Sequence, residues 1–190
     1  EVNSRWELLH GTLITVRFTS PMPNVIRVQL THFKGRLPAA PVFDLDYALT
    51  NPDVEIGRDD DHAWLKTGDL SVIVPTGGEW QITFERGGQP LTASEPRAVG
   101  LFNRDNTTYI RDQLSLQVGE TVYGLGERFG PLAKNGQTVD IWQFDGGTDS
   151  EYAYKNVPFY LSNRGYGVLV DSGLPVQFDV CQSTHSAVQI

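Results

Sequence analysis

Cysteine is almost absent from this sequence of 190 residues, which contains Cys181 and no other. A single cysteine excludes any disulfide within the chain. Proteins of reducing compartments seldom carry disulfides, although large secreted enzymes often lack them too. We therefore expect a cytoplasmic protein, and the cysteine content by itself leaves a secreted one open.

Clusters of basic residues and long apolar runs are also missing. The 15 Lys and Arg are scattered among 23 Asp and Glu, and the formal net charge is −8. Binding to nucleic acid requires clustered cations that neutralise phosphates, so we expect no nucleic-acid partner. A membrane-spanning helix needs ~20 consecutive, mainly apolar residues. No run approaches that length, and we expect no membrane partner either.

An apolar stripe at helical spacing is the third missing feature. No window of helical length repeats apolar residues at the positions i, i+3, i+4 and i+7. Apolar residues instead alternate with polar ones, which is the pattern of strands. The alternating sets are Ile14, Val16 and Phe18; Ile26, Val28 and Leu30; Leu70, Val72 and Val74; Trp80, Ile82 and Phe84; Leu114, Leu116 and Val118; and Val176, Phe178 and Val180.

Turn residues separate these sets, since the chain contains 19 Gly and 11 Pro. The segment Ser20–Asn24 is predicted to be a turn, because its two prolines fix φ and remove ladder donors. Gly87 and Gly88 predict a hairpin turn. Many short strands with such punctuation indicate an all-β fold, an antiparallel β-sandwich of two packed sheets. We expect residues 1–190 to form one such domain.

Familiar catalytic and metal-binding patterns are not found. The four histidines lack metal-ligand spacing, and we expect no metal and no cofactor. The acidic run Asp59–Asp61 is interpreted as a solvated loop, because its spacing is not that of a calcium loop. Gly124-Leu125-Gly126 begins like a dinucleotide-binding motif, but it lacks the third glycine and the following helix.

The segment from Thr121 to Val170 is rich in aromatic residues that alternate with Gly, Asn, Asp and Lys. Aromatic rings stack on the apolar faces of sugars, and carboxylates or amides bond their hydroxyls. Each ring has a second interpretation as part of the sandwich core. Asp145 precedes two glycines, which is ordinary turn chemistry, so its pattern alone leaves a structural role open. The aromatic residues are Tyr123, Phe129, Trp142, Phe144, Tyr152, Tyr154, Phe159, Tyr160 and Tyr166.

Several collinear sequence words in this region resemble glycoside hydrolase family 31, and within it the bacterial α-xylosidases. The resemblance is dense from Thr121 to Gly173, and it continues in looser form through Thr15–Pro21 and His32–Gly35. Several words in the family's order are far more specific than any one of them. The dense words are Glu120–Phe129, Asn135–Thr138, Asp145–Thr148, Tyr154–Tyr160 and Asn163–Val170.

The resemblance implies an N-terminal β-sandwich of the galactose-mutarotase-like type that precedes a (β/α)₈ barrel. In that family the barrel carries both catalytic carboxylates of a retaining mechanism. A barrel needs ~250 residues, so we expect this chain to be a fragment of a larger enzyme. We expect it to contain no catalytic residue, to be inactive alone and to be clipped at the C-terminal end of the sandwich. The implied partners are an oligosaccharide substrate, the enzyme's own barrel and a further copy in a homo-oligomer.

The resemblance also implies a substrate contact. The loop from Phe144 to Thr148 would reach over the barrel mouth, where Asp145 would bond sugar hydroxyls. Phe144 or Trp142 would form a wall of the pocket, and Gly146 and Gly147 would allow close approach of the backbone. The predicted substrate-binding residues are Trp142, Phe144, Asp145, Gly146 and Thr148.

Four neighbouring residues are favoured for structural roles. Glu127 and Arg128 are interpreted as a structural pair within the domain. The residues leave the role of Lys155 and Asn156 open between substrate contact and anchoring of the loop, and they favour anchoring.

Three functions remain in competition. The first is an enzyme domain from an α-xylosidase, or next an α-glucosidase, which lends part of the substrate pocket. The second is a free-standing carbohydrate-binding module with its own aromatic platform. The third is a mutarotase-like epimerase, which would need a paired carboxylate and histidine as acid and base. The scattered histidines disfavour that third function.

Overall fold

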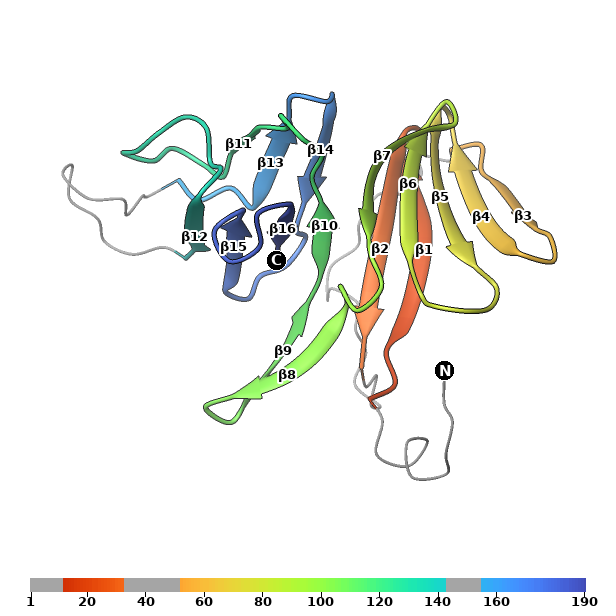
Figure 1. The fold of residues 1–190 in the computed structure, drawn as a ribbon, viewed down its shortest axis with the longest axis horizontal. Helices are drawn as coiled ribbons and strands as arrows, with labels where there is room; N and C mark the ends of the chain where they lie inside the picture. The colour runs from red at the N-terminus through yellow and green to blue at the C-terminus, as the bar shows by residue number, and fades with distance from the viewer. Residues whose placement is uncertain (1–11, 33–51, 143–154) are drawn as a thin grey trace, which may run out of the picture. The chain divides into compact units, whose positions relative to one another are not determined.

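The computed structural model describes residues 12–32, 52–142 and 155–190 (Figure 1). Regular structure in these ranges consists of β-strands, without a helix, which confirms the predicted all-β fold. It follows that these ranges hold no helix of the length and apolarity that crossing a membrane requires. The chain divides into two compact units, Glu1–Ile110 and Arg111–Ile190, and each is described by itself.

The first unit is built from antiparallel hairpins. Strands β1 (Thr15–Met22) and β2 (Val25–Thr31) form one hairpin. A five-stranded meander follows in the order β3-β4-β5-β6-β7, and the pair β8-β9 completes the described part of the unit (Figure 1). The bounds are β3 Glu55–Arg58, β4 His62–Thr67, β5 Leu70–Pro75, β6 Ile82–Arg86, β7 Gln89–Ser94, β8 Gly100–Arg104 and β9 Thr107–Arg111.

The core of the first unit lies between the β1-β2 hairpin and the meander. Leu65, Val72 and Ile82 point from β4, β5 and β6 into this core. Every second residue of β1 and β2 packs on them, because alternate side chains of a strand point to the same face. The predicted alternation and face-to-face packing are confirmed here, except at Trp80, which precedes β6 and is exposed. The hairpin contributes Val16, Phe18, Ile26 and Val28.

The predicted turn at Ser20–Asn24 is longer than the observed one. Strand β1 runs on to Met22, and only Pro23 and Asn24 form the turn. The pairing register shifts between Thr19 and Met22, so Pro21 lies in a bulge, where a missing N–H breaks no regular ladder bond. The prediction at Gly87–Gly88 is confirmed: both residues have positive φ, 56° and 78°, between β6 and β7.

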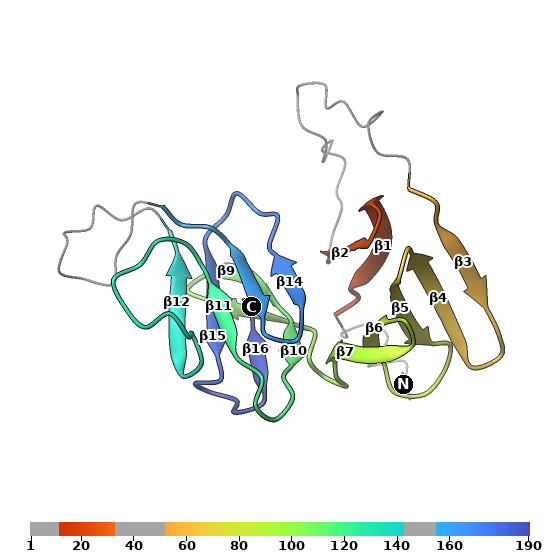
Figure 2. The same cartoon turned by 90° about the horizontal axis from the view of Figure 1, so that it is seen from above.

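The second unit contains two antiparallel sheets (Figure 2). One has the order β10-β16-β15-β12, and the other has the order β11-β13-β14. The bounds are β10 Gln113–Ser115, β11 Val122–Gly124, β12 Gln137–Ile141, β13 Phe159–Ser162, β14 Tyr166–Leu169, β15 Val176–Val180 and β16 Ala187–Gln189.

The two sheets of the second unit share one core. Val122 and Tyr160 come from the three-stranded sheet, while Val139, Phe178 and Val180 come from the four-stranded one. The Tyr160 and Phe178 rings meet edge to face, with centroids 6.2 Å apart. This packing matches the predicted sandwich, and β15 confirms the alternation of Val176, Phe178 and Val180.

The predicted alternation through Leu114, Leu116 and Val118 ends earlier than expected. Strand β10 stops at Ser115, and Val118 is fully exposed. The chain turns here because the Glu120 N–H donates to the Gln117 carbonyl at 3.0 Å. The Glu120 carboxylate accepts a hydrogen bond from the Gln117 N–H at 2.9 Å.

Candidate functional site

The candidate site is the base of the loop that carries the predicted substrate contacts. Phe144, Asp145, Gly146 and Thr148 lie outside the described residues. Trp142 is described: it follows β12 directly, and its side chain is 48% exposed. The structure therefore describes one predicted pocket residue, Trp142. It also describes the chain segments that precede and follow the other four.

The segment Gly124-Leu125-Gly126 packs against the far end of that loop. Gly124 and Gly126 have φ of 109° and 93°, values that glycine adopts readily. A Cβ on Gly126 would lie 2.1 Å from the Lys155 carbonyl oxygen. Leu125 between them is fully buried, and its N–H donates to the Phe159 carbonyl at 2.9 Å. Close approach of two backbones explains this motif.

Glu127 and Lys155 form the outer contact of the site. The Glu127 N–H donates to the Lys155 carbonyl at 3.0 Å, and the Lys155 Nζ lies 2.7 Å from the Glu127 Oε2. The hydrogen bond to Glu127 raises the pKa of the Lys155 ammonium. The side chains are 73% (Lys155) and 70% (Glu127) exposed. Water screens such a pair, so its contribution to stability is small.

Arg128 forms the inner contact and is half-buried. Its Nε donates to the Leu125 carbonyl at 2.9 Å, and its Nη2 donates to the Asp140 carbonyl at 2.7 Å and to the Asn156 Oδ1. The Asn156 amide then donates to the Trp142 carbonyl at 2.9 Å. A planar guanidinium presents its donors in a fixed fork. One arginine thus connects three separate backbone segments.

These contacts support the anchoring interpretation of Lys155 and Asn156. They also refine the expected structural pair: Glu127 bonds Lys155, and Arg128 bonds Asn156, so each partner lies across the loop base. The acceptors on Asp140 and Trp142 were not predicted. Both are backbone carbonyls, which every residue carries and which give no signal in the sequence.

A buried carboxylate lies elsewhere in the second unit. Glu120 is 6% exposed, and its Oε1 accepts hydrogen bonds from the Ser162 hydroxyl at 2.5 Å and the Tyr166 hydroxyl at 2.6 Å. Burial, and next the neighbouring Tyr166 and Glu120, raises the pKa of the Tyr160 phenol well above its ordinary value. Both carboxylate oxygens of Glu120 accept hydrogen bonds, and these bonds connect the turn that contains Glu120 to the β13-β14 hairpin. We therefore assign Glu120 a structural role.

A hollow of about 260 Å³ is lined by Cys181, His185 and Asn135 among others. This set of residue types can support thiol chemistry, so its protonation matters. Burial raises the pKa of the Cys181 thiol, which leaves little of the reactive thiolate at neutral pH. The Asn135 amide donates a weak hydrogen bond to its sulfur, at 3.8 Å. We assign no nucleophile here.

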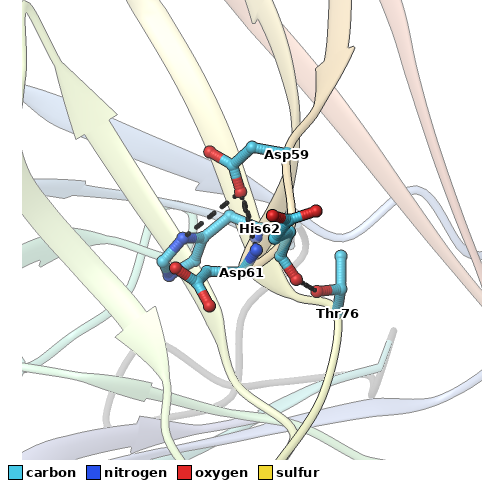
Figure 3. Close-up of polar contacts among 5 residues, drawn as sticks. Asp59, Asp61, His62 and Thr76 are labelled. Atoms are coloured by element: carbon cyan, nitrogen blue, oxygen red, sulfur yellow. Dashed lines mark hydrogen bonds and ion pairs between the residues drawn. The ribbon is translucent and has the colours of Figure 1, made fainter.

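The acidic run forms the turn between β3 and β4 (Figure 3). The Asp59 Oδ1 accepts hydrogen bonds from the Asp61 and His62 N–H groups at 2.9 and 2.6 Å. The bond from His62, then that from Asp61, lowers the pKa of the Asp59 carboxyl. The Asp60 carbonyl accepts from the Thr76 hydroxyl at 2.6 Å. All three aspartates are exposed, which confirms the predicted solvated loop.

The described residues also offer no metal centre. Over 12–32, 52–142 and 155–190, no group of three or more His, Cys, Asp or Glu side chains is arranged to hold an ion.

Comparison with known protein families and curated sequences gives consistent matches. The glycosyl hydrolase 31 N-terminal galactose mutarotase-like domain model matches residues 15–179. The α-xylosidase XylQ of Lactiplantibacillus pentosus is 42% identical over 191 residues, which cover 99% of this chain and 24% of that protein. An α-xylosidase of Emericella nidulans is 37% identical over 192 residues, covering 88% of this chain and 24% of that protein. The chain spans about a quarter of the length of these relatives.

Solved structures share the fold at low sequence identity. A family 31 α-xylosidase from a soil metagenome, complexed with xylose, aligns with a TM-score of 0.68 and 20% identity over 93% of this chain and 28% of that one. A family 31 dextranase from Flavobacterium johnsoniae, complexed with isomaltotriose, aligns with a TM-score of 0.73 and 17% identity over 94% of this chain and 24% of that one. These alignments show a shared fold, and the family model confirms the predicted galactose-mutarotase-like type of domain.

Proposed function

Because this chain belongs to the family of glycosyl hydrolase 31 N-terminal galactose mutarotase-like domains, we propose that it is the non-catalytic front domain of a retaining α-glycosidase. The enzyme hydrolyses terminal α-linked sugars, with α-xylosides as the first candidate substrates and α-glucosides as the second. The observation that carries this proposal is 42% identity to an α-xylosidase over 99% of the chain. The domain packs on the catalytic barrel of the same polypeptide.

The non-catalytic role is supported by the contacts of the buried carboxylates Glu120 and Asp179. Glu120 accepts three hydrogen bonds within the fold, and Asp179 accepts bonds from the Gln182 and Ser183 N–H groups. A retaining glycosidase needs two carboxyl groups about 5–5.5 Å apart that face the substrate. Carboxylates already saturated with internal donors do not suit that task. The family match runs through both compact units, which supports one domain over residues 1–190.

The loop after Trp142 is the proposed contribution to the substrate pocket. It carries Phe144 and Asp145, and its base is held by the Arg128 and Asn156 contacts. A carboxylate is a strong acceptor for sugar hydroxyls, and the half-exposed Trp142 offers an aromatic surface for the apolar face of a pyranose. Gly146 and Thr148 complete this pocket edge.

The test is the activity of the enzyme that contains this domain. Aryl α-xylosides should be hydrolysed faster than aryl α-glucosides, and proton NMR should show the α-anomer of the released sugar first, because the mechanism retains configuration. The 190-residue chain alone should release no sugar. Hydrolysis with inversion, or no hydrolysis of either glycoside by the complete enzyme, contradicts the proposal.

A free-standing carbohydrate-binding module is the second candidate. It is favoured by the exposure of two aromatic rings near the loop base, Trp142 at 48% and Phe129 at 59%. A binding module should hold sugar unaided, whereas a pocket edge with one or two hydroxyl contacts should not. Isothermal titration of the 190-residue chain with xylose, isoprimeverose and maltose separates the two. Millimolar or tighter binding favours the module.

A further inference from the structure

We propose that the outer face of the β11-β13-β14 sheet is the surface on which the catalytic barrel of the same polypeptide packs. The outer face is the side of this sheet that points away from the core of the second unit. The inference rests on the proposed function, which supplies the barrel, and it adds the part of the domain that the barrel covers. The residues of the outer face are Tyr123, Phe159, Leu161, Gly167 and Leu169.

Strand pairing brings the residues of the outer face together. Tyr123 lies opposite Leu161 on the neighbouring strand, and Leu161 lies opposite Gly167. Phe159 lies opposite Leu169 in the adjacent row. Directly opposed residues of antiparallel strands share a face, and successive residues of one strand alternate between faces. Because the residues that alternate with them belong to the core cluster, these side chains point outward.

The outer face is apolar, although part of it is exposed. Leu161 is 50% exposed and Leu169 is 61% exposed, while Tyr123 and Phe159 are half-buried. The Phe159 ring extends across Gly167, where a Cβ would lie 2.6 Å from the ring Cζ. Glycine within a strand permits such a close approach. The ring therefore lies along the sheet and leaves a flat apolar surface, of the kind that marks an interaction site.

The other sheet of the second unit has a polar outer face. Its outward residues on β12 and β15 are paired as Thr138 with Asp179 and Asp140 with Gln177. The Gln177 amide donates to the Asp140 carboxylate at 2.7 Å. An antiparallel sheet with one solvated face alternates apolar and polar residues. Strands β12 and β15 follow this rule, as expected for a face that meets water.

Strands β13 and β14 do not follow the same rule. Phe159, Tyr160 and Leu161 form an uninterrupted apolar run, and Val168 and Leu169 form another. A short continuous apolar run is typical of a strand that is buried on both faces. Within the described part of the second unit, the four-stranded sheet covers the inner face (Figure 2). The sequence of β13 and β14 therefore calls for a second covering layer on the outer face.

The length of the relatives points to a layer from the same polypeptide. This chain spans 24% of each α-xylosidase that it matches, and the proposed function places a barrel in the remainder. Tethering within one polypeptide gives a local concentration of about millimolar, so a small apolar face is sufficient. The inward-facing surface of the barrel is expected to present apolar side chains to it.

Two other occupants fit the outer face less well. A standard interface between separate chains engages ~20–30 residues a side, far more than this face offers. Each copy also has a formal net charge of −8, and like net charge opposes self-association. A sugar would need aromatic rings together with convergent polar groups. Leu161 and Leu169, the exposed side chains of this face, supply neither.

Thiol labelling of the complete enzyme tests whether the outer face is covered. Leu161→Cys and Leu169→Cys place thiols on this face, and Gln177→Cys places the control thiol on the polar face of the other sheet. We expect both outer-face thiols to react with a maleimide at least about tenfold more slowly than the control, because a docked surface reacts only when it opens. All three should react equally fast in urea. Rates in the folded enzyme equal to the control overturn the proposal, and the two positions allow the test even if one variant does not fold.

Photo-cross-linking identifies the covering layer. Benzoylphenylalanine in place of Leu169 should cross-link to peptides of the barrel within the same molecule. A mixture of ordinary and isotope-labelled enzyme separates links within one molecule from links between copies. Links between copies, or links confined to residues 1–190, overturn the proposal. The proposed function fails separately, if the wild-type enzyme hydrolyses neither glycoside, so the two failures are distinguishable.

Discussion

The Tyr166 hydroxyl donates a hydrogen bond to the buried carboxylate of Glu120 at 2.6 Å, across 46 residues of sequence. The same oxygen of Glu120 accepts the Ser162 hydroxyl. The bond therefore joins the turn before β11 to the hairpin that β13 and β14 form. A carboxylate so deeply buried depends on its donors, because an unpaired buried charge is costly.

Removing this hydrogen bond should destabilise the second unit without changing its fold. We expect Tyr166→Phe to lower the free energy of unfolding by about 1.5–3 kcal/mol, the usual value for a hydrogen bond to a charged group. Urea unfolding of the 190-residue chain measures it. Tyr109→Phe is the control, since Tyr109 is 41% exposed, and it should stay within about 0.5 kcal/mol of wild type. Equal losses for both variants would contradict the assigned role of Glu120.

The packing of Gly126 on the loop base predicts a strong effect of a single methyl group. In Gly126→Ala the new Cβ would lie 2.1 Å from the Lys155 carbonyl oxygen, at a residue whose φ is 93°. We expect the free energy of unfolding to fall by about 1–3 kcal/mol or more. Thermal or urea unfolding provides the measurement.

Gly130→Ala is the matched control for this substitution. A Cβ at Gly130 meets nothing within 4 Å, so the variant should lie within about 0.5 kcal/mol of wild type. Equal stability of Gly126→Ala and Gly130→Ala would contradict the close approach of the Gly126 and Lys155 backbones.

Asp179 predicts part of the acid sensitivity. Burial raises the pKa of its carboxyl, but hydrogen bonds from the Ser183 hydroxyl, the Ser183 N–H and the Gln182 N–H outweigh burial and hold that pKa below its ordinary value. The folded state thus binds the proton more weakly than the unfolded state. The stabilisation by Asp179 is complete above the unfolded pKa and disappears as the pH falls through the lowered folded pKa.

Replacing the carboxylate should remove that dependence. We expect Asp179→Asn to be less stable than wild type near pH 7 and to lose less further stability between about pH 5 and pH 3. Urea unfolding at several pH values tests this. Parallel pH profiles for the two proteins would show that Asp179 is not the responsible group.

The sequence predicts the strands better than it predicts their ends. Alternation at Val176, Phe178 and Val180 indicates β15, because burial on one face is a local pattern. The turn at Ser20–Asn24 was predicted too long, since a bulge makes room for Pro21 in a way that depends on the partner strand. Strand β10 ends before the predicted Val118, and the Glu120 carboxylate accepts a hydrogen bond from the Gln117 N–H in the turn that follows.

The sequence indicates which residues form the candidate site, but it does not predict which of them contact each other. Family resemblance drew attention to Glu127, Arg128, Lys155 and Asn156 together. Arg128 and Asn156 are 28 positions apart, and they meet only because β11 and β13 are neighbours in one sheet. No local spacing encodes that proximity. The carbonyl acceptors at the loop base likewise depend on the folded backbone.

The steady-state kinetics of Asp145→Ala in the complete enzyme, with an aryl α-xyloside as substrate, test most directly whether this domain contacts the substrate. Asp60→Ala, in the exposed turn after β3, is the control and should behave as wild type. We expect a ten- to hundredfold fall in kcat/KM for Asp145→Ala, roughly the effect of one hydrogen bond to a charged group, with an unchanged melting temperature. Wild-type kcat/KM in a folded Asp145→Ala enzyme would contradict a substrate contact from this domain.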